Sequence, residues 1–344
     1  MRAAAVTGYG PAEESLALID LPDPDPGPGE VLVRVEAASV NPIDARKRAG
    51  YGRALFEKRR DALFPWVLGG DCAGVVEAAG PGVDAWAPGD AVMAGTGAFG
   101  PGTHAERVAL RAQWLAPKPA NLSFAEAAAL PYAALTVWSA LVRFGGVKPR
   151  GPDRAALVNG ASGGTGVMAV QLLKAWGWSV AATASVDAAP LLRDLGADVV
   201  IDRRAEDFAT HLRDLDLVLD GVGDAVEGME RRCLSVLRPG GAYVALVHPI
   251  ASSLDRYGLL QGGAAAAALF AKQSLAAGRA RYRWALYRPD GAALAEIGRL
   301  AESGALRPIL DTVLPLDAVA EAHRRVEAGG VRGKIVLAVG AEGA

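Results

Sequence analysis

The chain has 344 residues, enough for two domains, and its formal net charge of −2 offers no basic surface field for nucleic acid. Its two cysteines, Cys72 and Cys233, lie in apolar stretches and indicate buried thiols in a reducing compartment rather than a disulfide framework. The first residues are already strand-like, and no apolar stretch reaches the roughly 18 residues of a membrane span, so we expect a cytoplasmic protein without a membrane span.

Short alternating apolar segments separated by Pro- and Gly-rich turns occupy the N-terminal third of the chain. Such segments are typical of strands, and they occur at residues 3–6, 31–37, 74–78, 91–93 and 106–109. They predict a partly closed β-barrel. Ser123 and Glu126 then form a capping-box pattern that opens an Ala-rich helix, and a domain boundary is expected nearby.

A glycine-rich turn, NGASGGTG at residues 159–166, follows an apolar run and precedes a helical pattern. Its four glycines would let a ligand approach the backbone closely. The N-terminus of the following helix favours an anion such as the pyrophosphate of a dinucleotide. A plain tight turn is the alternative, because such a motif alone is a weak signal.

The segments after this turn alternate between strand and helix. A strand at 179–184, a helix at 188–195 and a strand at 198–201 complete the βαβαβ half of a doubly wound fold. Two more parallel strands are predicted at 217–219 and 243–247. Ligands in such sheets bind at the carboxyl ends of the strands, where Val222, Gly223, Val247 and His248 stand.

The Ala- and Leu-rich residues 252–281 break this alternation and predict two short helices. They form either a surface insertion or a lid, because the segment follows directly on His248. A strand at 281–287, a helix at 292–302 and a terminal strand at 335–338 come next, and the C-terminal segment is expected to return to the first domain.

Several motifs together resemble the medium-chain dehydrogenase/reductase superfamily, and within it the zinc-free quinone oxidoreductases. These motifs are ASVNPIDARKRAGY (38–51), FPWVLGGDCAGVV (64–76), LPYAALTVWSAL (130–141), NGASGGTG (159–166), DGVGD (220–224) and RGKIVL (332–337). YVALV (243–247), LDRYG (254–258) and YRWAL (282–286) are similar to the branch of the mitochondrial reticulon-4-interacting oxidoreductase.

The resemblance implies a fold class and a division into domains. The fold is α/β, with a Rossmann doubly wound parallel sheet and a GroES-like, partly closed β-barrel. The GroES-like catalytic domain is expected from residues 1–127 and 288–344, and the NADPH-binding Rossmann domain from residues 128–287, with a helical insertion near 252–281.

Zinc-binding members of the superfamily carry ligands at places that here resemble Gly70, the Asp44/Ala45 neighbourhood and Tyr132. A catalytic zinc needs three N, S or O protein ligands, and a four-cysteine structural site needs more cysteines than the chain has. We therefore expect no metal. Without a Lewis acid, adding hydride to an electron-poor enone or quinone is easier than deprotonating an alcohol.

Three residues are predicted to act on the substrate. Asn41 matches the family position that faces nicotinamide and substrate, and its amide could donate to a developing enolate; the alternative is a turn residue before Pro42. Tyr132 offers a phenol as proton or hydrogen-bond donor, with an aromatic helix-cap contact as the alternative. Tyr51 matches an aromatic position that lines the pocket, and Asp44 is interpreted as a buried structural acceptor.

Residues at the turn, at the strand ends and at two family positions are predicted to bind the cofactor. They are Thr136, Ala161, Ser162, Gly163, Gly164, Thr165, Gly166, Ser185, Arg203, Val222, Gly223, Val247, His248 and Lys334. Thr136 and Lys334 are implied by the resemblance alone, and a core-facing helix threonine is the alternative for Thr136.

The end of the second strand decides between NADPH and NADH. NAD-binding units place a carboxylate there to bind the ribose hydroxyl. Here the strand ends at Ser185, and Asp187 suits the cap of the next helix. Arg203 and Arg204 follow the third strand and could bind a 2′-phosphate, or be solvated surface charges. We therefore predict NADPH.

The remaining histidines suggest structural roles: His211 and His323 lie in polar helical stretches typical of solvated side chains, and His104 lies in a strand as a hydrogen-bonded imidazole. Three functions stay open. They are an NADPH-dependent quinone or enone reductase, an enoyl-thioester reductase, and a non-catalytic NADPH-binding interaction protein. A small-molecule substrate is expected, and a homodimer is left open.

Overall fold

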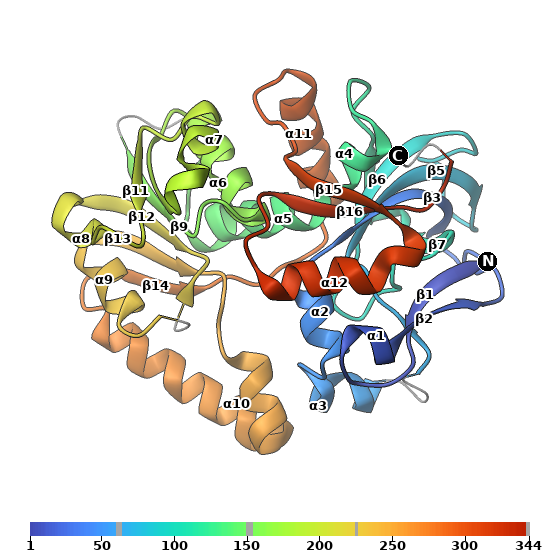
Figure 1. Ribbon diagram of the computed structural model, residues 1–344, viewed down its shortest axis with the longest axis horizontal. Coiled ribbons are helices and arrows are strands. Elements are labelled where there is room, and N and C mark those ends of the chain that lie inside the picture. Colours follow the sequence, from blue (N-terminus) through green and yellow to red (C-terminus); the bar gives the residue numbers. More distant parts are fainter. Residues whose placement is uncertain (60–63, 149–153, 224–225, 342–344) are drawn as a thin grey trace. The chain divides into compact units, whose positions relative to one another are not determined.

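A computed structural model describes the chain except for residues 60–63, 149–153, 224–225 and 342–344. Asp224, the last residue of the DGVGD motif, thus lies outside the described residues. The chain forms two compact units, which we name the terminal unit (Met1–Leu135 with Arg288–Ala344) and the central unit (Thr136–Tyr287) (Figure 1).

The first division between the units falls inside helix α5 (Pro131–Trp138), later than the expected boundary after residue 127. The reason lies in helix α4 (Phe124–Ala128). Its predicted capping box is present, with the Ser123 hydroxyl accepting the Glu126 N–H at 3.2 Å, but the helix packs on strands of the terminal unit.

The described residues of the terminal unit form two sheets. The three-stranded sheet has the order β2 (Leu16–Asp20), β1 (Arg2–Val6) and β4 (Trp66–Val67). The larger sheet has the order β15 (Leu310–Pro315), β16 (Lys334–Ala338), β3 (Glu30–Val40), β5 (Asp71–Ala79), β6 (Ala91–Gly95) and β8 (Leu115–Pro117), while β7 (Arg107–Arg111) pairs with β3. Among the described residues no strand pairing closes this path into a barrel.

Helices of the terminal unit are short in its N-terminal part and longer in its C-terminal part. They are α1 (Ala12–Ser15), α2 (Pro42–Arg48), α3 (Arg53–Phe56), α4, α11 (Gly291–Glu302) and α12 (Val319–Ala328). Helix α12 packs against α2, β3 and β16. Strands from both ends of the chain therefore share one sheet and one core.

The central unit is built on a six-stranded sheet in which every neighbouring pair is parallel. The order is β11 (Val199–Asp202), β10 (Ser179–Ala184), β9 (Ala155–Asn159), β12 (Leu215–Asp220), β13 (Leu237–Ala245) and β14 (Arg281–Trp284). This is the doubly wound order with a switch point between β9 and β12. The predicted fold class is confirmed.

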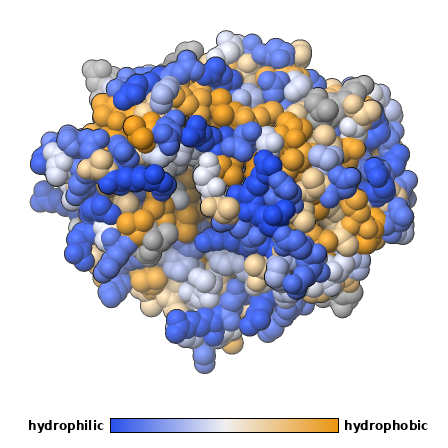
Figure 2. Space-filling view, viewed as in Figure 1, coloured by the Kyte–Doolittle hydropathy of each residue, from blue (hydrophilic) through white to orange (hydrophobic). Residues whose placement is uncertain are grey.

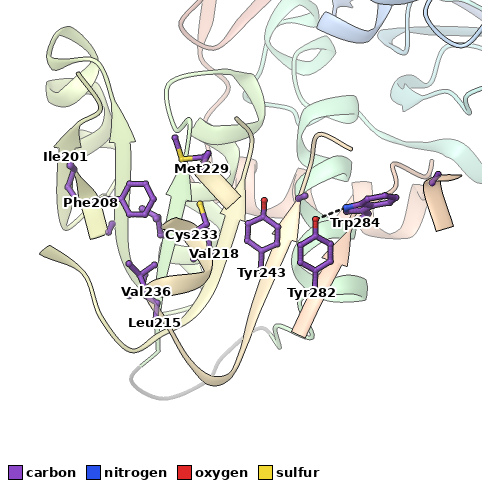
Figure 3. Packing of buried hydrophobic residues seen from close by; sticks show 14 residues of the cluster. Ile201, Phe208, Leu215, Val218, Met229, Cys233, Val236, Tyr243, Tyr282 and Trp284 are labelled. Carbon is purple, nitrogen blue, oxygen red and sulfur yellow. Dashed lines mark hydrogen bonds between the residues drawn. The ribbon is translucent and has the colours of Figure 1, made fainter. Parts of the chain in front are cut away.

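Helices cover both faces of this sheet. Figure 1 shows α6 (Gly164–Ala175) and α7 (Ala189–Asp194) on one side, and α9 (Met229–Ser235) with α10 (Ile250–Ala276) on the other. Helix α8 (Phe208–His211) is a single turn, and a π-helical turn at Ser139–Phe144 follows α5. The core beneath α9 and α10 includes stacked aromatic rings, with Tyr243 and Tyr282 centroids 5.1 Å apart (Figure 3).

The segment expected as a helical insertion is α10, which consists of two helical pieces joined at Gly258, where φ is +77°. Leu260 and Leu275 on α10 are 90% and 82% exposed. Figure 2 shows a mainly hydrophilic face with separate hydrophobic patches. One stretch of the described chain, Phe124–Phe144, is long and apolar enough to cross a membrane, but 72% of the 18-residue segment that meets this criterion is buried, as in the core helix of a folded domain.

Candidate functional site

Three neighbouring strands of the terminal unit bring polar residues to one end of the large sheet. Strand β3 pairs with β5 along one edge and with β16 along the other. The register sets Cys72 opposite Ala38 on one side and Ile335 opposite Val40 on the other. Asp71 therefore begins β5 beside Ser39, and Lys334 begins β16 beside Asn41. We name Ser39, Asn41, Asp71 and Lys334 the polar cluster.

Asp71 is the acceptor at the centre of this polar cluster. Its Oδ1 accepts the Ser39 hydroxyl at 2.6 Å and the Asn41 amide Nδ2 at 2.9 Å, and its Oδ2 accepts the backbone N–H of Tyr132 at 3.0 Å. Burial raises the pKa of Asp71, while Lys334 and these three donors act in the opposite direction. These hydrogen bonds favour the charged form of the carboxyl group and oppose the effect of its burial.

Asn41 links the two charged members of the cluster. It is the N-cap residue of α2, and its backbone N–H donates to Asp44 Oδ2 at 2.9 Å. Its amide nitrogen faces Asp71 Oδ1 and, at 3.5 Å, Ser39 Oγ. Its amide oxygen accepts the ammonium of Lys334. The side chain predicted to donate to an enolate thus directs its N–H groups to its neighbours within the protein.

Lys334 is only 4% exposed. Burial lowers the pKa of Lys334, and the carboxylates of Asp71 and Asp44 oppose that shift. The two carboxylates that favour the ammonium form of Lys334 lie on β5 and α2. The sequence interpretation placed Lys334 with the cofactor and did not connect it to Asn41.

Tyr132 lies against Gly70, and both positions resemble metal-ligand positions of the zinc-binding members of the superfamily. A Cβ added to Gly70 would stand 2.9 Å from the ring carbon Cδ2 of Tyr132 and 3.7 Å from Asn41 Nδ2. A histidine at position 70 would therefore displace the phenol ring. Burial, followed by the nearby charges of Asp44 and Asp71 and by Tyr51, raises the pKa of Tyr132. Its phenol is therefore a neutral hydrogen-bond donor near pH 7.

Tyr51 and Asp44, the other residues predicted nearby, are brought toward this tyrosine. Tyr51 is half-buried, it acts electrostatically on Tyr132, and the guanidinium of Arg46 lies 5.2 Å from its ring centroid. Asp44 is 1% exposed and accepts from the backbone of Asn41, as interpreted from the sequence.

Two histidines, His104 and His323, follow the polar cluster through the backbone of Ser39. His104 Nε2 is 3.1 Å from the carbonyl oxygen of Ser39, which agrees with a structural imidazole. His323 on α12 is fully buried, so the interpretation of a solvated side chain is wrong. Its ring centroid lies 6.1 Å from that of His104. The polar sequence around His323 does not indicate burial. The histidine is buried because α12 packs against α2, β3 and β16.

The glycine-rich turn of the central unit joins β9 to α6. Gly160 has φ +82°, a left-handed conformation that favours glycine, and a Cβ on Gly166 would stand 2.5 Å from the Ala161 carbonyl oxygen. A Cβ on Gly163, the N-cap of α6, would point into open space. The turn therefore leaves room for a ligand over the first N–H groups of a twelve-residue helix.

A buried network ties this turn to the loop after β12. The Thr183 hydroxyl accepts the Gly160 N–H at 3.0 Å and donates to Asn159 Oδ1 at 2.6 Å. The Asn159 amide then donates to Asp220 Oδ1 at 2.9 Å. Sequence reasoning missed Asp220, although an acid that ends an apolar strand beside glycines is a signal for it.

Asp220 also holds the next predicted cofactor residues. Its Oδ1 accepts the backbone N–H of Val222 at 2.9 Å and that of Gly223 at 3.1 Å, and its Oδ2 accepts the Tyr243 hydroxyl at 2.7 Å. The loop after β12 is therefore fixed to the turn after β9 through one carboxylate.

The other predicted cofactor residues of the central unit differ in exposure. Ser162, Gly163, Gly164 and Thr165 are half-buried and Ala161 and Gly166 are buried; Thr136, Ser185 and His248 are half-buried, and Arg203 and Val247 are exposed. Asp187 is exposed in the short turn Val186–Ala188, and the N-cap of α7 is Ala188 without a side-chain cap hydrogen bond, so the interpretation of Asp187 as a helix cap is wrong. His248 Nε2 is 3.2 Å from the Ala285 carbonyl oxygen, and its ring stacks on Trp284.

Sequence profiles and known proteins agree on a family for this chain. The profile of the alcohol dehydrogenase GroES-like domain matches residues 27–120, and that of the zinc-binding dehydrogenase matches residues 195–337. The mouse mitochondrial NAD(P)H oxidoreductase RTN4IP1 is 39% identical over 90% of this chain and 82% of its own length. The chain belongs to the medium-chain dehydrogenase/reductase superfamily.

Two further members resemble this medium-chain dehydrogenase/reductase along almost its whole length. The chloroplastic NADPH-dependent alkenal/one oxidoreductase of Arabidopsis thaliana is 31% identical over 98% of this chain and 79% of its own length. The quinone oxidoreductase structure from Coxiella burnetii has a TM-score of 0.83 and 30% identity, and the match covers 99% of each chain. The predicted resemblance is confirmed.

The expected cellular location is wrong. A cytoplasmic location is overturned because the animal relatives of this medium-chain dehydrogenase/reductase are mitochondrial proteins. Composition and two buried thiols are compatible with any reducing compartment, so they could not separate one from another.

Proposed function

We propose that this chain is an NADPH-dependent oxidoreductase that delivers hydride to a quinone or an α,β-unsaturated carbonyl. The observation that carries the proposal is the polar cluster beside Tyr132, because a nucleotide-binding unit alone would need no buried ammonium and neutral phenol in the other unit. The names of the relatives, an alkenal/one oxidoreductase and a quinone oxidoreductase, support the same substrate class.

The central unit fits a dinucleotide. The space over Gly163 and the start of α6 accommodates a pyrophosphate, and the Asp220 network fixes the neighbouring loop. Strand β10 ends without a carboxylate, and the side chains nearby are the hydroxyl of Ser185 and the exposed guanidinium of Arg203. We infer that Ala161–Gly166, Val222 and Gly223 hold the pyrophosphate side, and that Ser185 and Arg203 bind a 2′-phosphate.

We also propose that the reaction proceeds without zinc. Tyr132 occupies the space that a side chain at position 70 would need, and no three His, Cys, Asp or Glu side chains of the described residues gather as metal ligands. Bound NADPH supplies the hydride. The terminal unit must then polarise an acceptor that is already electron-poor, which a phenol and an ammonium can do by hydrogen bonding.

The test is NADPH oxidation measured with separate panels of quinones, enones and enoyl thioesters, together with the metal content of the purified protein. We expect turnover with quinones or enones that survives exhaustive chelation. Turnover with enoyl thioesters alone would favour the second reductase assignment. Tight NADPH binding without oxidation by any acceptor would instead favour the interaction protein.

A Tyr132→Phe variant tests the phenol separately. Removing one oriented donor to a developing oxyanion is expected to lower turnover about a hundredfold, because that hydrogen bond strengthens only as charge develops. The affinity for NADPH should stay unchanged. Full turnover in Tyr132→Phe would remove the phenol from the mechanism.

A further inference from the structure

The polar cluster contains a buried ammonium with unused hydrogen-bonding capacity. A lysine ammonium carries three N–H donors. Across the described residues, the hydrogen bonds of Lys334 reach one acceptor, the amide oxygen of Asn41. Burying a cation with donors to spare is costly unless another acceptor completes its shell. The environment of Lys334 therefore indicates a ligand oxygen.

Arg48, the other arginine or lysine buried to this degree among the described residues of the terminal unit, provides the contrast. It is 1% exposed, and its guanidinium binds the Gly10 carbonyl and the Glu327 carboxylate. Its charge is thus paired directly. Lys334 instead contacts a neutral amide, and Asp71, one of the two carboxylates that act on its charge, already accepts three donors.

The amide of Asn41 cannot donate a hydrogen bond to a substrate oxygen. Both hydrogens of its amide nitrogen are directed to Asp71 Oδ1 and Ser39 Oγ, and its oxygen faces Lys334. Turning the amide over would place its nitrogen against the ammonium and its oxygen against the carboxylate, which is repulsive on both sides. The charges around it therefore fix the orientation of Asn41.

We propose that Lys334 is a catalytic residue that donates a hydrogen bond to the carbonyl oxygen of the substrate, and that Asn41 is the positioning residue that aims it. This inference rests on the proposed reduction of quinones or enones. With an enone acceptor, the hydride and its electron pair form a C–H bond at the β-carbon, the C=C π pair becomes the new double bond between the α-carbon and the carbonyl carbon, and the C=O π pair moves onto oxygen to give an enolate. Lys334 stabilises that oxygen, and a proton from water completes the product at the α-carbon.

The same ammonium could instead bind an oxygen of the cofactor, as the sequence interpretation had it. A cofactor oxygen and a substrate oxygen would both accept a hydrogen bond from Lys334. Removing Lys334 would have a different effect in each case. A cofactor contact would weaken NADPH binding. A substrate contact would lower turnover and leave the dissociation constant of NADPH unchanged.

The main variant is Lys334→Met, which keeps the length of the side chain and removes its charge. We expect its kcat with the best acceptor to fall about a hundredfold, with the NADPH dissociation constant, measured by fluorescence titration, within about twofold of the original protein. Lys118→Met is the matched control, because Lys118 is a partly buried lysine of the same unit that donates to the Pro119 carbonyl. A large loss of NADPH affinity in Lys334→Met, without such a loss in Lys118→Met, would overturn the proposal.

Removing Lys334 leaves Asp71 as an uncompensated buried charge, so the single variant could unfold. The double variant Lys334→Met with Asp71→Asn removes both charges and keeps the shape of the cluster. It should show the same loss of kcat in a folded protein. Turnover at the original rate in either folded variant would contradict the assignment.

A binding measurement separates this inference from the proposed function. Para-nitrophenolate, an oxyanion that mimics an enolate, is titrated into the NADP⁺ complex and followed by its absorbance. We expect the original protein to favour the bound phenolate over the phenol, and Lys334→Met to lose that preference by about tenfold or more. The Asn41→Leu variant should lose part of this preference. It retains the Lys334 ammonium but lacks the amide oxygen that orients it.

Each result of the titration bears on Lys334 whether or not turnover is found. If no quinone or enone is reduced but the phenolate preference depends on Lys334, the proposed function fails and the oxyanion site stands. If turnover is present and neither turnover nor phenolate binding depends on Lys334, the proposed function stands and this inference fails. Absence of phenolate binding by the original protein would also overturn it.

Discussion

At the scale of single residues, burial decides the charge state of several side chains in this molecule. His323 is fully buried on α12, and neither of its ring nitrogens has a hydrogen-bond partner among the described residues. Burial, followed by the neighbouring His104, lowers the pKa of His323 to about 3, while Asp44 acts in the opposite direction. A neutral imidazole is therefore built into the folded state.

This residue makes stability depend on pH. The folded pKa lies below the ordinary value near 6.5, so the unfolded chain binds an extra proton as the pH falls below about 6.5, and folding loses free energy until about pH 3. At pH 5 the loss from this group is about 2 kcal/mol. Urea unfolding at pH 7 and pH 5 should show that His323→Leu loses about 2 kcal/mol less than the original protein.

The matched control is the exposed His211, whose ring lies 3.3 Å from Glu206. His211→Gln should leave the pH dependence as it is in the original protein. If His323→Leu loses as much free energy between the two pH values as the original protein does, the buried imidazole is not the source of the acid sensitivity.

At the scale of elements, the two loops of the central unit that we propose bind the cofactor are linked through a single carboxylate. Asp220 accepts from Asn159, from the loop at Val222 and Gly223, and from Tyr243 on the neighbouring strand. Tyr243 is 1% exposed, and burial together with the charge of Asp220 raises its pKa, so its hydroxyl remains a donor. Strands β9, β12 and β13 are joined at their carboxyl ends by this network.

Tyr243→Phe should therefore lower both stability and NADPH affinity. Losing a donor to a buried carboxylate is expected to cost about 1–3 kcal/mol in the free energy of unfolding. Because Asp220 orients the loop, NADPH and NADH should weaken by the same factor. Chemical denaturation and titration of both cofactors measure the two effects, with Tyr257→Phe on the exposed part of α10 as the control. A stability loss without any change in cofactor affinity would limit the network to a structural role.

The sequence predicted these elements unevenly. Apolar runs gave the parallel strands closely, such as 179–184 for β10 (Ser179–Ala184). Strands β2, β8 and β15 were not predicted. They are short or alternate between half-buried and exposed residues, as in β15, so their hydrophobic pattern is weak.

The candidate site was predicted in part, for a reason that lies in chain topology. Asn41, Tyr132 and Lys334 were named from family positions, but the bond from Lys334 to Asn41 spans 293 residues and depends on β16 pairing with β3. Ser39 and Asp71 carry no local signal, since a serine in a strand and an acid after two glycines are common. Only the register of three strands places them together.

At the scale of the whole molecule, the preference between NADPH and NADH depends on the side chains near the end of β10, where no carboxylate ends the strand. The described end of β10 offers the hydroxyl of Ser185, and the Arg203 backbone N–H donates to the Ala184 carbonyl at 2.9 Å, which brings the residue after β11 beside that end. Asp187 and Arg203 are both exposed. A guanidinium can engage a 2′-phosphate through charge-assisted bonds, whereas Asp187 would repel it.

We therefore predict that the folded chain is stabilised more by NADPH than by NADH, and that Arg203→Ala removes most of the difference. A ligand at 100 times its dissociation constant stabilises the folded state by about 2.7 kcal/mol, and at 10 times by about 1.4 kcal/mol. Losing the charged contact should weaken NADPH about tenfold and leave NADH nearly unchanged. Thermal unfolding with each cofactor, in the original protein, in Arg203→Ala and in the exposed control Arg193→Ala, measures this. Equal stabilisation by both cofactors in the original protein would refute the preference for NADPH, and an equal loss for both in Arg203→Ala would show that this arginine does not bind the 2′-phosphate.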